Sequence, residues 1–362
     1  MKMNYRSILD LLLTEIKNGM YPFHSLLPPE EELAAKFGVS RPTIAKVYNT
    51  LQDENYVFKR KGVGTRVIFK KNKNSLTFGL LLPGAGESEI FSIINNRFLE
   101  HSLNGEFECL WDGTTAGNAD TRKEWIEIYS DNYISKKVDG VFFAPLERVE
   151  MADDVNKKIC DRFTDAGIPL ILIDRDIVEF PHRSIYDLIS LDNFNAGYTM
   201  AEHLLDSNCT TIHFVYRQGS AFSVTLRRLG VAAAVHRRGL IFTNDNVYCG
   251  NLEDAEFVKK IKINPAHTGI ICANDSTAAV LMSTMDSLGI KISEDTLICG
   301  FDDMKYASLL KYPLTSYSQP CIEIADIAIE MMLRRIKNED MKANYINLTG
   351  EVIFRQSSVF RQ

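Results

Sequence analysis

The sequence of 362 residues predicts an α/β protein in two parts: a small N-terminal helical module that ends in a hairpin, and a larger domain of two doubly wound parallel sheets. Two observations lead to this fold class. After residue 76, near-continuous apolar segments alternate with helical ones, which is typical of parallel strands covered on both faces. Before residue 70, apolar residues recur at helical spacing, with glycine and proline at the breaks.

Length and composition indicate a globular chain. Its 45% hydrophobic content can supply a core, and its length allows two or three domains. No apolar run approaches the roughly 18 residues that span a bilayer, and charges interrupt the N-terminal apolar stretch, so we expect no signal peptide, no membrane partner and a cytoplasmic location. The seven cysteines form no C-x-x-C pair, so we expect buried, reduced thiols, no metal site and no cofactor.

Charge is unevenly distributed along the chain. Residues 1–75 contain 13 Lys and Arg against 7 Asp and Glu, whereas the remainder contains 28 against 40. A basic module attached to an acidic remainder suggests a polyanionic partner for the N-terminal end only, since the acidic part would repel nucleic acid. A solvated basic face without a partner is the alternative interpretation of the charge alone.

Three helices are predicted in the N-terminal module, over residues 5–17, 30–37 and 41–54. Gly38 ends the second helix, and Ser40 can cap the third, whose first turn tolerates Pro42. The last two helices are therefore joined by a turn of three or four residues, which is the spacing of a helix-turn-helix.

The third helix presents a polar face opposite its apolar stripe. Arg41, Pro42, Thr43 and Lys46 lie on that face or at its N-terminal end. Arg and Lys suit guanine edges and phosphates, and Thr can reach base edges or backbone. A helix that packs through one face and shows such residues in its N-terminal half has the geometry that enters the major groove of DNA.

A basic hairpin follows the third helix. Residues 56–69 predict two short strands around a tip that contains Gly62 and Gly64. Basic side chains flank this tip: Lys59, Arg60, Lys61 and Arg66. A helix-turn-helix pattern by itself is common among helical pairs, but helix, turn, helix and basic wing in this order are rarely combined by accident.

The larger domain begins after a linker. Residues 70–75 are polar, charged and without periodicity, so we divide the chain into residues 1–69, this linker and residues 76–362. Residues 76–362 are too many for a single sheet of ordinary size, which predicts two lobes with a cleft between them. Ligands in such folds bind beyond the carboxyl ends of the strands.

Polar residues follow the predicted strands at those ends: Asp174, Arg175, Asn274, Asp302 and Gln319. Ser223 and Arg227 begin a helix after another strand, and Phe91 follows the first strand, where its ring can cover a sugar face. Carboxylates accept bonds from neighbouring hydroxyls, while Arg, Asn and Gln add fixed donors and acceptors. Any one of these residues could instead cap a helix, as we expect of Asp275. Several at one edge predict a binding site.

Residues 26–67, LLPPEEELAAKFGVSRPTIAKVYNTLQDENYVFKRKGVGTRV, resemble the winged helix-turn-helix of the GntR family of bacterial transcription regulators. The resemblance implies that Arg41 and Lys46 contact DNA from the recognition helix. It also implies that Gly62 and Gly64 let the wing approach the minor groove. Glu31 departs from the family pattern, which usually has a basic residue between two acids of the second helix, so that phosphate contact is not carried over.

Residues 76–362 resemble the effector domain of the LacI family and the periplasmic sugar-binding proteins. The likeness includes VDGVFFAP (138–145), IPLILIDRD (168–176) and LICGFDD (297–303). It implies that hydroxyls of a small sugar are held by six residues: Asp174, Arg175, Arg227, Asn274, Asp302 and Gln319. It further implies that Phe91 stacks on the sugar and Ser223 contributes, although the loop before Phe91 is atypical of the family. A winged helix fused to such a sensor is known among arabinose-responsive repressors.

Together the resemblances imply a sugar-responsive transcription regulator, a repressor that binds a palindromic operator as a homodimer. A sugar-active enzyme and a sugar-binding protein without DNA regulation are the alternatives. The sequence has no G-x-G-x-x-G after a strand, no phosphate-binding G-x-x-x-x-G-K-[ST] and no nucleophile elbow, so we expect no enzymatic activity. The basic N-terminal module argues against a protein that only captures sugar. The identity of the sugar, the operator and the sign of the response are left open.

Overall fold

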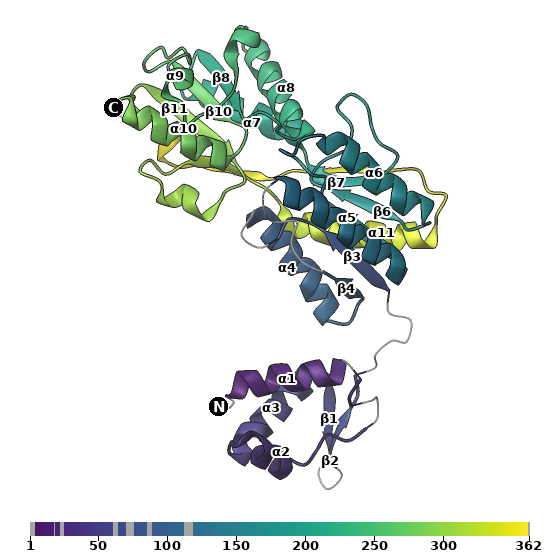
Figure 1. The fold of residues 1–362 in the computed structure, drawn as a ribbon. Coiled ribbons are helices and arrows are strands. Elements are labelled where there is room, and N and C mark those ends of the chain that lie inside the picture. The colour runs from purple at the N-terminus through teal and green to yellow at the C-terminus, as the bar shows by residue number, and fades with distance from the viewer. Residues whose placement is uncertain are drawn as a thin grey trace. The chain divides into compact units, whose positions relative to one another are not determined.

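The computed structural model describes residues 4–17, 19–21, 25–60, 64–69, 76–84, 89–111 and 119–360, and for residues 119 and 120 the backbone alone. The chain divides into two compact units, Met1–Ser75 and Leu76–Gln362, which are described one at a time (Figure 1).

The first unit is a winged helix-turn-helix, as predicted. Its described residues form three helices and one hairpin: α1 (Tyr5–Lys17), α2 (Glu30–Phe37), α3 (Arg41–Asp53), β1 (Val57–Arg60) and β2 (Gly64–Val67). The helices pack their apolar stripes together, and Ile8, Leu33 and Tyr48 are buried in this core. β1 and β2 pair antiparallel, and Leu27 N donates to Thr65 O at 2.8 Å, which ties the segment before α2 to the wing.

The turn between α2 and α3 depends on glycine. Gly38 has a φ of 64°, in the left-handed region that an L side chain rarely adopts, and it ends α2 as predicted. Ser40 stands at the N-cap position of α3, but its hydroxyl contacts Thr43 Oγ1 at 2.8 Å and makes no bond to a backbone amide. The predicted position of the cap is therefore right, and its predicted side-chain bond is absent.

The first lobe of the larger unit contains a parallel sheet in the order β13-β7-β6-β5-β3-β4 within the described residues. Its strands are β3 (Thr77–Leu81), β4 (Glu108–Leu110), β5 (Gly140–Phe143), β6 (Leu170–Ile173), β7 (Asp187–Leu191) and β13 (Tyr345–Leu348). Its helices are α4 (Glu89–Leu103), α5 (Ala119–Lys136), α6 (Ala152–Asp165) and α11 (Cys321–Lys337). Helices α4 and α11 share one core with the sheet, while α5 and α6 share another, so both faces are covered.

The second lobe has a sheet in the order β14-β12-β11-β10-β8-β9. Its strands are β8 (Thr211–Tyr216), β9 (Val247–Cys249), β10 (Thr268–Cys272), β11 (Thr296–Phe301), β12 (Thr315–Ser318) and β14 (Glu351–Ile353). Its helical segments are α7 (Asn193–Asp206), α8 (Phe222–Arg237), α9 (Ala255–Val258), α10 (Asp275–Ser287), η1 (Asn244–Asn246), η2 (Lys305–Leu309) and η3 (Gln356–Ser358). β14 runs antiparallel to β12, so the prediction of parallel pairing is wrong for this edge strand.

The chain crosses between the two lobes at three points along the described elements, after β7, after β12 and after β13. Each lobe is thus assembled from segments that are far apart in the sequence. This arrangement confirms the predicted two-lobed α/β architecture, and it brings the carboxyl ends of strands from both sheets toward one another.

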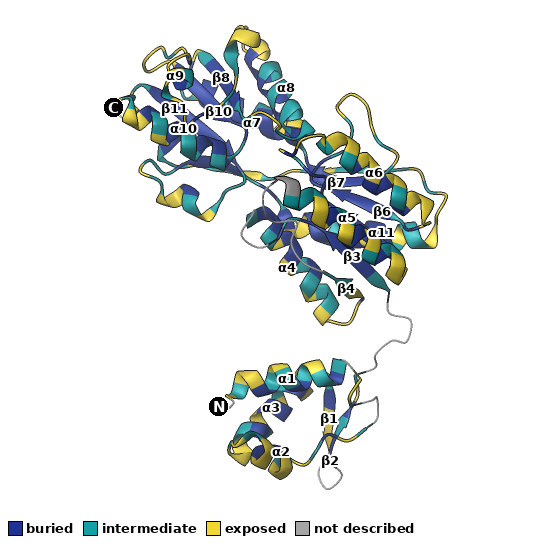
Figure 2. Ribbon diagram, in the orientation of Figure 1, coloured by how far each residue is buried: buried dark blue, intermediate teal, exposed yellow. Residues whose placement is uncertain are grey.

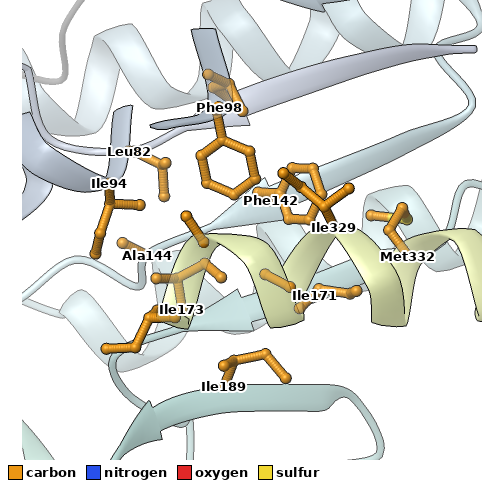
Figure 3. Packing of buried hydrophobic residues seen from close by; sticks show 14 of the residues in the cluster. Leu82, Ile94, Phe98, Phe142, Ala144, Ile171, Ile173, Ile189, Ile329 and Met332 are labelled. Atoms are coloured by element: carbon orange, nitrogen blue, oxygen red, sulfur yellow. The ribbon is translucent and has the colours of Figure 1, made fainter. Parts of the chain in front are cut away.

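The core of the first lobe shows why its strands are continuously apolar. The strands are buried between the flanking helices (Figure 2). Phe98 of α4 and Phe142 of β5 have ring centroids 4.4 Å apart, and Ile329 and Met332 of α11 point into the same core (Figure 3). A Cβ at Gly140 would lie 2.4 Å from Met332 Sδ, so a larger residue there would have to displace the Met332 side chain.

All seven cysteines are free thiols. Five are buried, and burial raises the pKa of the Cys272 thiol, which keeps it protonated. The expected burial is wrong for Cys249, which is exposed, and incomplete for Cys109, which is half-buried.

Candidate functional site

The predicted DNA-facing surface lies on the N-terminal half of α3. Arg41, Pro42 and Lys46 are exposed and Thr43 is half-buried, while Val47 on the opposite side is fully buried. Three of these four residues are therefore open to solvent and Thr43 is partly so, as contact with a duplex requires.

Two carboxylates hold the Arg41 side chain. Its Nε donates to Glu30 Oε2 at 3.2 Å, and its Nη1 lies 3.1 Å from Glu31 Oε1. Glu30 also accepts a bond from Lys59 of β1, and the bonds from Lys59 and Arg41 lower the pKa of Glu30. The first turn of α2 therefore contacts both the recognition helix and the wing.

The wing is described in part. Gly64 has a φ of 115°, a conformation in which any other residue would be strained. Lys61 and Gly62, which are also predicted to contact DNA, lie outside the described residues.

The second candidate site is a cavity of about 410 Å³ between the lobes of the larger unit. All eight residues predicted to bind ligand line it: Phe91, Asp174, Arg175, Ser223, Arg227, Asn274, Asp302 and Gln319. They come together because the carboxyl ends of the parallel strands meet at one edge of each sheet. The volume lies within the range of small-molecule sites.

Asp302 is the central carboxylate on the second-lobe side. It follows β11, accepts a bond from Gln319 Nε2 at 2.8 Å, and lies 4.0 Å from Arg227 Nη2. Burial raises its pKa to about 6, against the opposing effects of Arg227 and the bond from Gln319. Gln319 Oε1 is buried without a hydrogen-bond partner in the structure, so it can accept a bond from a ligand.

Arg227 is fixed by protein contacts along two of its nitrogens. Its Nε donates to Asn193 Oδ1 at 2.8 Å and its Nη1 donates to Ala273 O at 2.6 Å. Its guanidinium carbon lies 4.6 Å from the centroid of the Phe301 ring. Nη2 is the nitrogen nearest Asp302, so it is pre-oriented to share a ligand with that carboxylate.

The first lobe contributes a buried ion network. Arg175 donates through Nε to Asp174 Oδ2 at 2.9 Å, and its Nη1 lies 3.0 Å from Glu147 Oε2. Burial opposes ionisation of Glu147, but Arg175 and Arg148 outweigh it and lower its pKa to about 2. Asp174 and Arg175 both line the cavity, and the hydrogen bond between them already occupies one donor of Arg175 and one acceptor of Asp174.

In the structure Asn274, and not Asp275, caps α10, while Asn274 also lines the cavity. Asn274 is the N-cap of α10, since its Oδ1 accepts from Thr277 N at 2.9 Å, and its amide nitrogen is the group left for a ligand. Asp275, expected as the cap, is instead fully buried and accepts from Ser316 Oγ at 2.6 Å and Met304 N at 2.8 Å. Asp275 thereby holds the loop that carries Asp302. The prediction of Asp275 as a cap is wrong, because a side chain one position into the helix faces the sheet.

The aromatic wall of the cavity is formed by Phe91 of α4. Its ring is nearly buried, and the Arg175 guanidinium carbon lies 5.9 Å from its centroid. Ser223, at the start of α8, lines the facing side and is 8% exposed. The cavity thus combines one ring face with converging donors and acceptors.

The described part of the chain lacks two other features. No group of three His, Cys, Asp or Glu side chains there has the arrangement of a metal site. None of its helices is both long enough and apolar enough to span a membrane.

Family models match both units. Residues 4–67 match the model described as bacterial regulatory proteins, gntR family, and residues 201–358 match the model of a periplasmic binding protein-like domain. Residues 4–67 are thus similar to gntR-family domains, and residues 201–358 are similar to periplasmic binding protein-like domains.

Proteins that are similar to this chain over most of its length include named transcriptional repressors. An arabinose metabolism transcriptional repressor of Halalkalibacterium halodurans is 23% identical over 94% of this chain and 91% of its own length. The HTH-type transcriptional repressor PurR of Photobacterium profundum is 22% identical over 88% of this chain and 90% of its own length.

Solved structures support the fold of the binding protein-like domain. The transcription regulator CcpA of Lactococcus lactis superposes with a TM-score of 0.64 at 20% identity, covering 78% of this chain and 99% of that one. A LacI family regulator of Enterococcus faecium with bound ribose has a TM-score of 0.61 at 22% identity, covering 79% of this chain and 100% of that one.

Sequence reasoning missed several residues that line the cavity: Arg122, Glu147, Arg148, Ser276 and Tyr306. Glu147 could have been found by extending the search past the strand end, because it stands four residues after β5, whereas Asp174 directly follows β6. Tyr306 lies on the short helix η2, and no periodicity in the sequence marks that segment as part of the cleft.

Proposed function

We propose that this protein is a transcription regulator that binds operator DNA through its gntR-family domain and a monosaccharide in the cleft of its binding protein-like domain. The observation that carries the proposal is the convergence of eight predicted residues on one cavity, in a chain that also bears a helix-turn-helix with an exposed basic face. The repressor names of the relatives that span both domains favour the same function.

The chemistry of the cavity suits an uncharged sugar. Asp302 and Gln319 offer acceptors, and Asn274 and Arg227 offer donors, on side chains that protein contacts already orient. A sugar hydroxyl both donates and accepts, so a ring bearing several hydroxyls can satisfy this mixed set, and Phe91 can cover its apolar face. Relatives named for arabinose and a structure with bound ribose make pentoses the first candidates.

The DNA-binding part of the proposal uses the predicted face of α3 and the wing. Arg41 and Lys46 supply the exposed cations, Pro42 and Thr43 lie beside them, and Lys61, Gly62 and Gly64 belong to the wing. A homodimer would place two such heads on the half-sites of a palindrome, because a two-fold symmetric protein matches a two-fold symmetric operator.

Coupling between the two functions would act through closure of the cleft. Contacts already join the lobes beside the cavity: Ala221 N donates to Glu147 Oε2 at 3.1 Å and Arg148 N donates to Gly219 O at 2.9 Å. A sugar held by both lobes would favour the closed arrangement and so bias the protein between DNA-competent and incompetent states. Such coupling is typically about 1 to 3 kcal/mol, and we expect the sugar to weaken operator binding.

A thermal-shift screen of monosaccharides, followed by gel retardation, tests the proposal. A ligand at 100 times its dissociation constant stabilises by about 2.7 kcal/mol, so the matching sugar should raise the melting temperature measurably. The same sugar should then change retardation of a duplex that the protein selects from a randomised pool. Turnover assays on the same sugars address the enzyme alternative, and we expect no product. Absence of any sugar shift together with absence of duplex retardation would overturn the proposal.

A further inference from the structure

The carboxylates around Arg41 differ in how firmly they are held. Glu30 has a side chain that is 15% exposed and contacts both Arg41 and Lys59, so it is part of the frame between α2, α3 and the wing. Glu31 has a side chain that is 76% exposed, and its ion pair in the structure is with Arg41 Nη1 at 3.1 Å. Glu31 therefore stands at the open rim of the surface proposed to meet DNA.

The contacts of Arg41 leave part of its guanidinium available. Nε is used by Glu30 and Nη1 approaches Glu31, whereas Nη2 has no hydrogen-bond or ion-pair partner among the described residues. Two nitrogens of the guanidinium thus contact α2, and Nη2 is the nitrogen that remains for another partner. Nη2 can still donate to an acceptor of a guanine, O6 or N7.

A carboxylate at position 31 has different effects on contacts with DNA phosphates and on contacts with base edges. A phosphate that approached Nη2 of Arg41 would carry a negative charge into the neighbourhood of Glu31, and like charges repel. A guanine edge is neutral, so its acceptors can bind Arg41 without that penalty. Because phosphate contacts are independent of sequence while base contacts are not, the penalty falls mainly on non-specific binding.

We propose that Glu31 is a specificity-determining residue of the DNA surface, which reserves Arg41 for base edges by disfavouring phosphate contacts there. This inference rests on the proposed function, since it concerns the same DNA-binding face. Glu31 acts through Arg41 and is a positioning residue. Exposed ion pairs of this kind are weak, so the expected change in non-specific affinity is about two- to fivefold.

The test compares Glu31→Gln with Glu32→Gln in the full chain. Both variants remove one negative charge from neighbouring exposed positions of α2, but Glu32 makes no ion pair with Arg41 in the described structure. Two probes are needed: a random-sequence duplex, and a duplex that the wild-type chain recovers from a randomised pool. Affinities for both are measured over a series of salt concentrations.

For Glu31→Gln we expect affinity for the random duplex to rise about two- to fivefold, with a smaller change for the recovered duplex. The specificity ratio, which is the affinity for the recovered duplex divided by that for the random duplex, should therefore be lower in Glu31→Gln than in Glu32→Gln. In an Arg41→Ala background the difference between the two variants should vanish. Equal ratios for the two variants, or a difference that persists without Arg41, would overturn the inference while leaving the proposed function intact. If the wild-type chain bound no duplex at low salt, the proposed function would fail as well.

Discussion

At the scale of single residues, two aspartates near the cleft have raised pKa values. Burial raises the pKa of Asp302 to about 6 and that of Asp275 to about 8, and the charge of Asp302 adds to the second shift. Asp302 lines the cavity, whereas Asp275 lies behind it and holds the loop that follows β11. The first aspartate is therefore expected to affect ligand binding and the second to affect stability.

Sugar affinity should depend on the protonation of Asp302. The carboxylate is present above a pKa of about 6 and is lost as the pH falls below it, and the anion is the better acceptor for a sugar hydroxyl. If only the anion binds well, affinity at pH 5 should be about tenfold weaker than at pH 8. Calorimetric titration at both pH values checks this. Asp302→Asn should bind weakly at both, and an equally strong pH dependence in this variant would contradict the assignment.

The stability of the binding protein-like domain should fall as the pH rises from about 4 to 8. The folded state holds the Asp275 proton up to a pKa of about 8, whereas an unfolded chain releases it near the ordinary value, so the folded form is favoured at low pH and this contribution is lost as the pH rises. Asp275→Asn stays uncharged and should melt about 5 °C above the wild type at pH 8, with little difference at pH 5. Melting temperatures are measured by calorimetry for both proteins. A difference between the two that is the same at pH 5 and at pH 8 would refute the effect.

At the scale of elements, the position of Arg227 depends on how closely α7 and α8 cross. A Cβ on Gly197 of α7 would lie 2.0 Å from Arg227 O, and a Cβ on Gly230 of α8 would lie 2.0 Å from Phe194 O. Two glycines thus allow backbone contact between the helices. Since α8 also carries Ser223 and Val224, any displacement of this helix moves three of the residues that line the cavity.

Gly197→Ala should separate these helices. The added methyl meets backbone atoms that cannot rotate away, so we expect a loss of about 1 to 3 kcal/mol in stability together with loss of the sugar-induced thermal shift. Thermal unfolding with and without the identified sugar measures both effects. Asn195→Ala, an exposed substitution on the same helix, is the control and should leave the shift unchanged. A normal shift in Gly197→Ala would show that the close crossing is not required.

At the scale of the whole molecule, two functions are assigned to two separate compact units. The N-terminal unit, Met1–Ser75, has its own core, and the larger unit builds its cleft from chain segments that cross between lobes three times in the described structure. Ligand and DNA affinities can then be changed independently by mutation, although they remain linked thermodynamically.

Two substitutions should show this independence. Arg227→Ala removes a cavity donor and should abolish the sugar-induced thermal shift while leaving operator affinity nearly unchanged. Arg41→Ala removes an exposed cation of α3 and should weaken operator binding at least several-fold while the thermal shift remains. Gel retardation and thermal shift on both variants complete the comparison. A variant that loses both activities would indicate unfolding or a shared surface and would contradict the division.

The predictions from sequence were correct where a local pattern along the chain determines the structure. Parallel strands end at a common edge, so the residues that follow them, Asp174, Asn274 and Asp302, could be grouped by their positions along the chain, and helical periodicity located α3 and its exposed face. The same rule could not reveal that the side-chain oxygen of Asn274 accepts the hydrogen bond that caps α10. It also did not identify β7, β9, β13 or β14. The last three are edge strands of three or four residues, and the polar residues Asp187 and Ser190 interrupt the apolar pattern of β7.

From the residues alone one could infer two domains, their fold class, the helix with the exposed basic face and most of the polar lining of the cleft, because periodicity, turn residues and strand ends are local properties. Three-dimensional packing was needed to pair Glu147 with Arg175, to bury Asp275 behind Asp302 and to set Glu31 against Arg41. These contacts join residues from different elements, and their energies depend on burial and on distances between atoms, which no spacing along the chain determines.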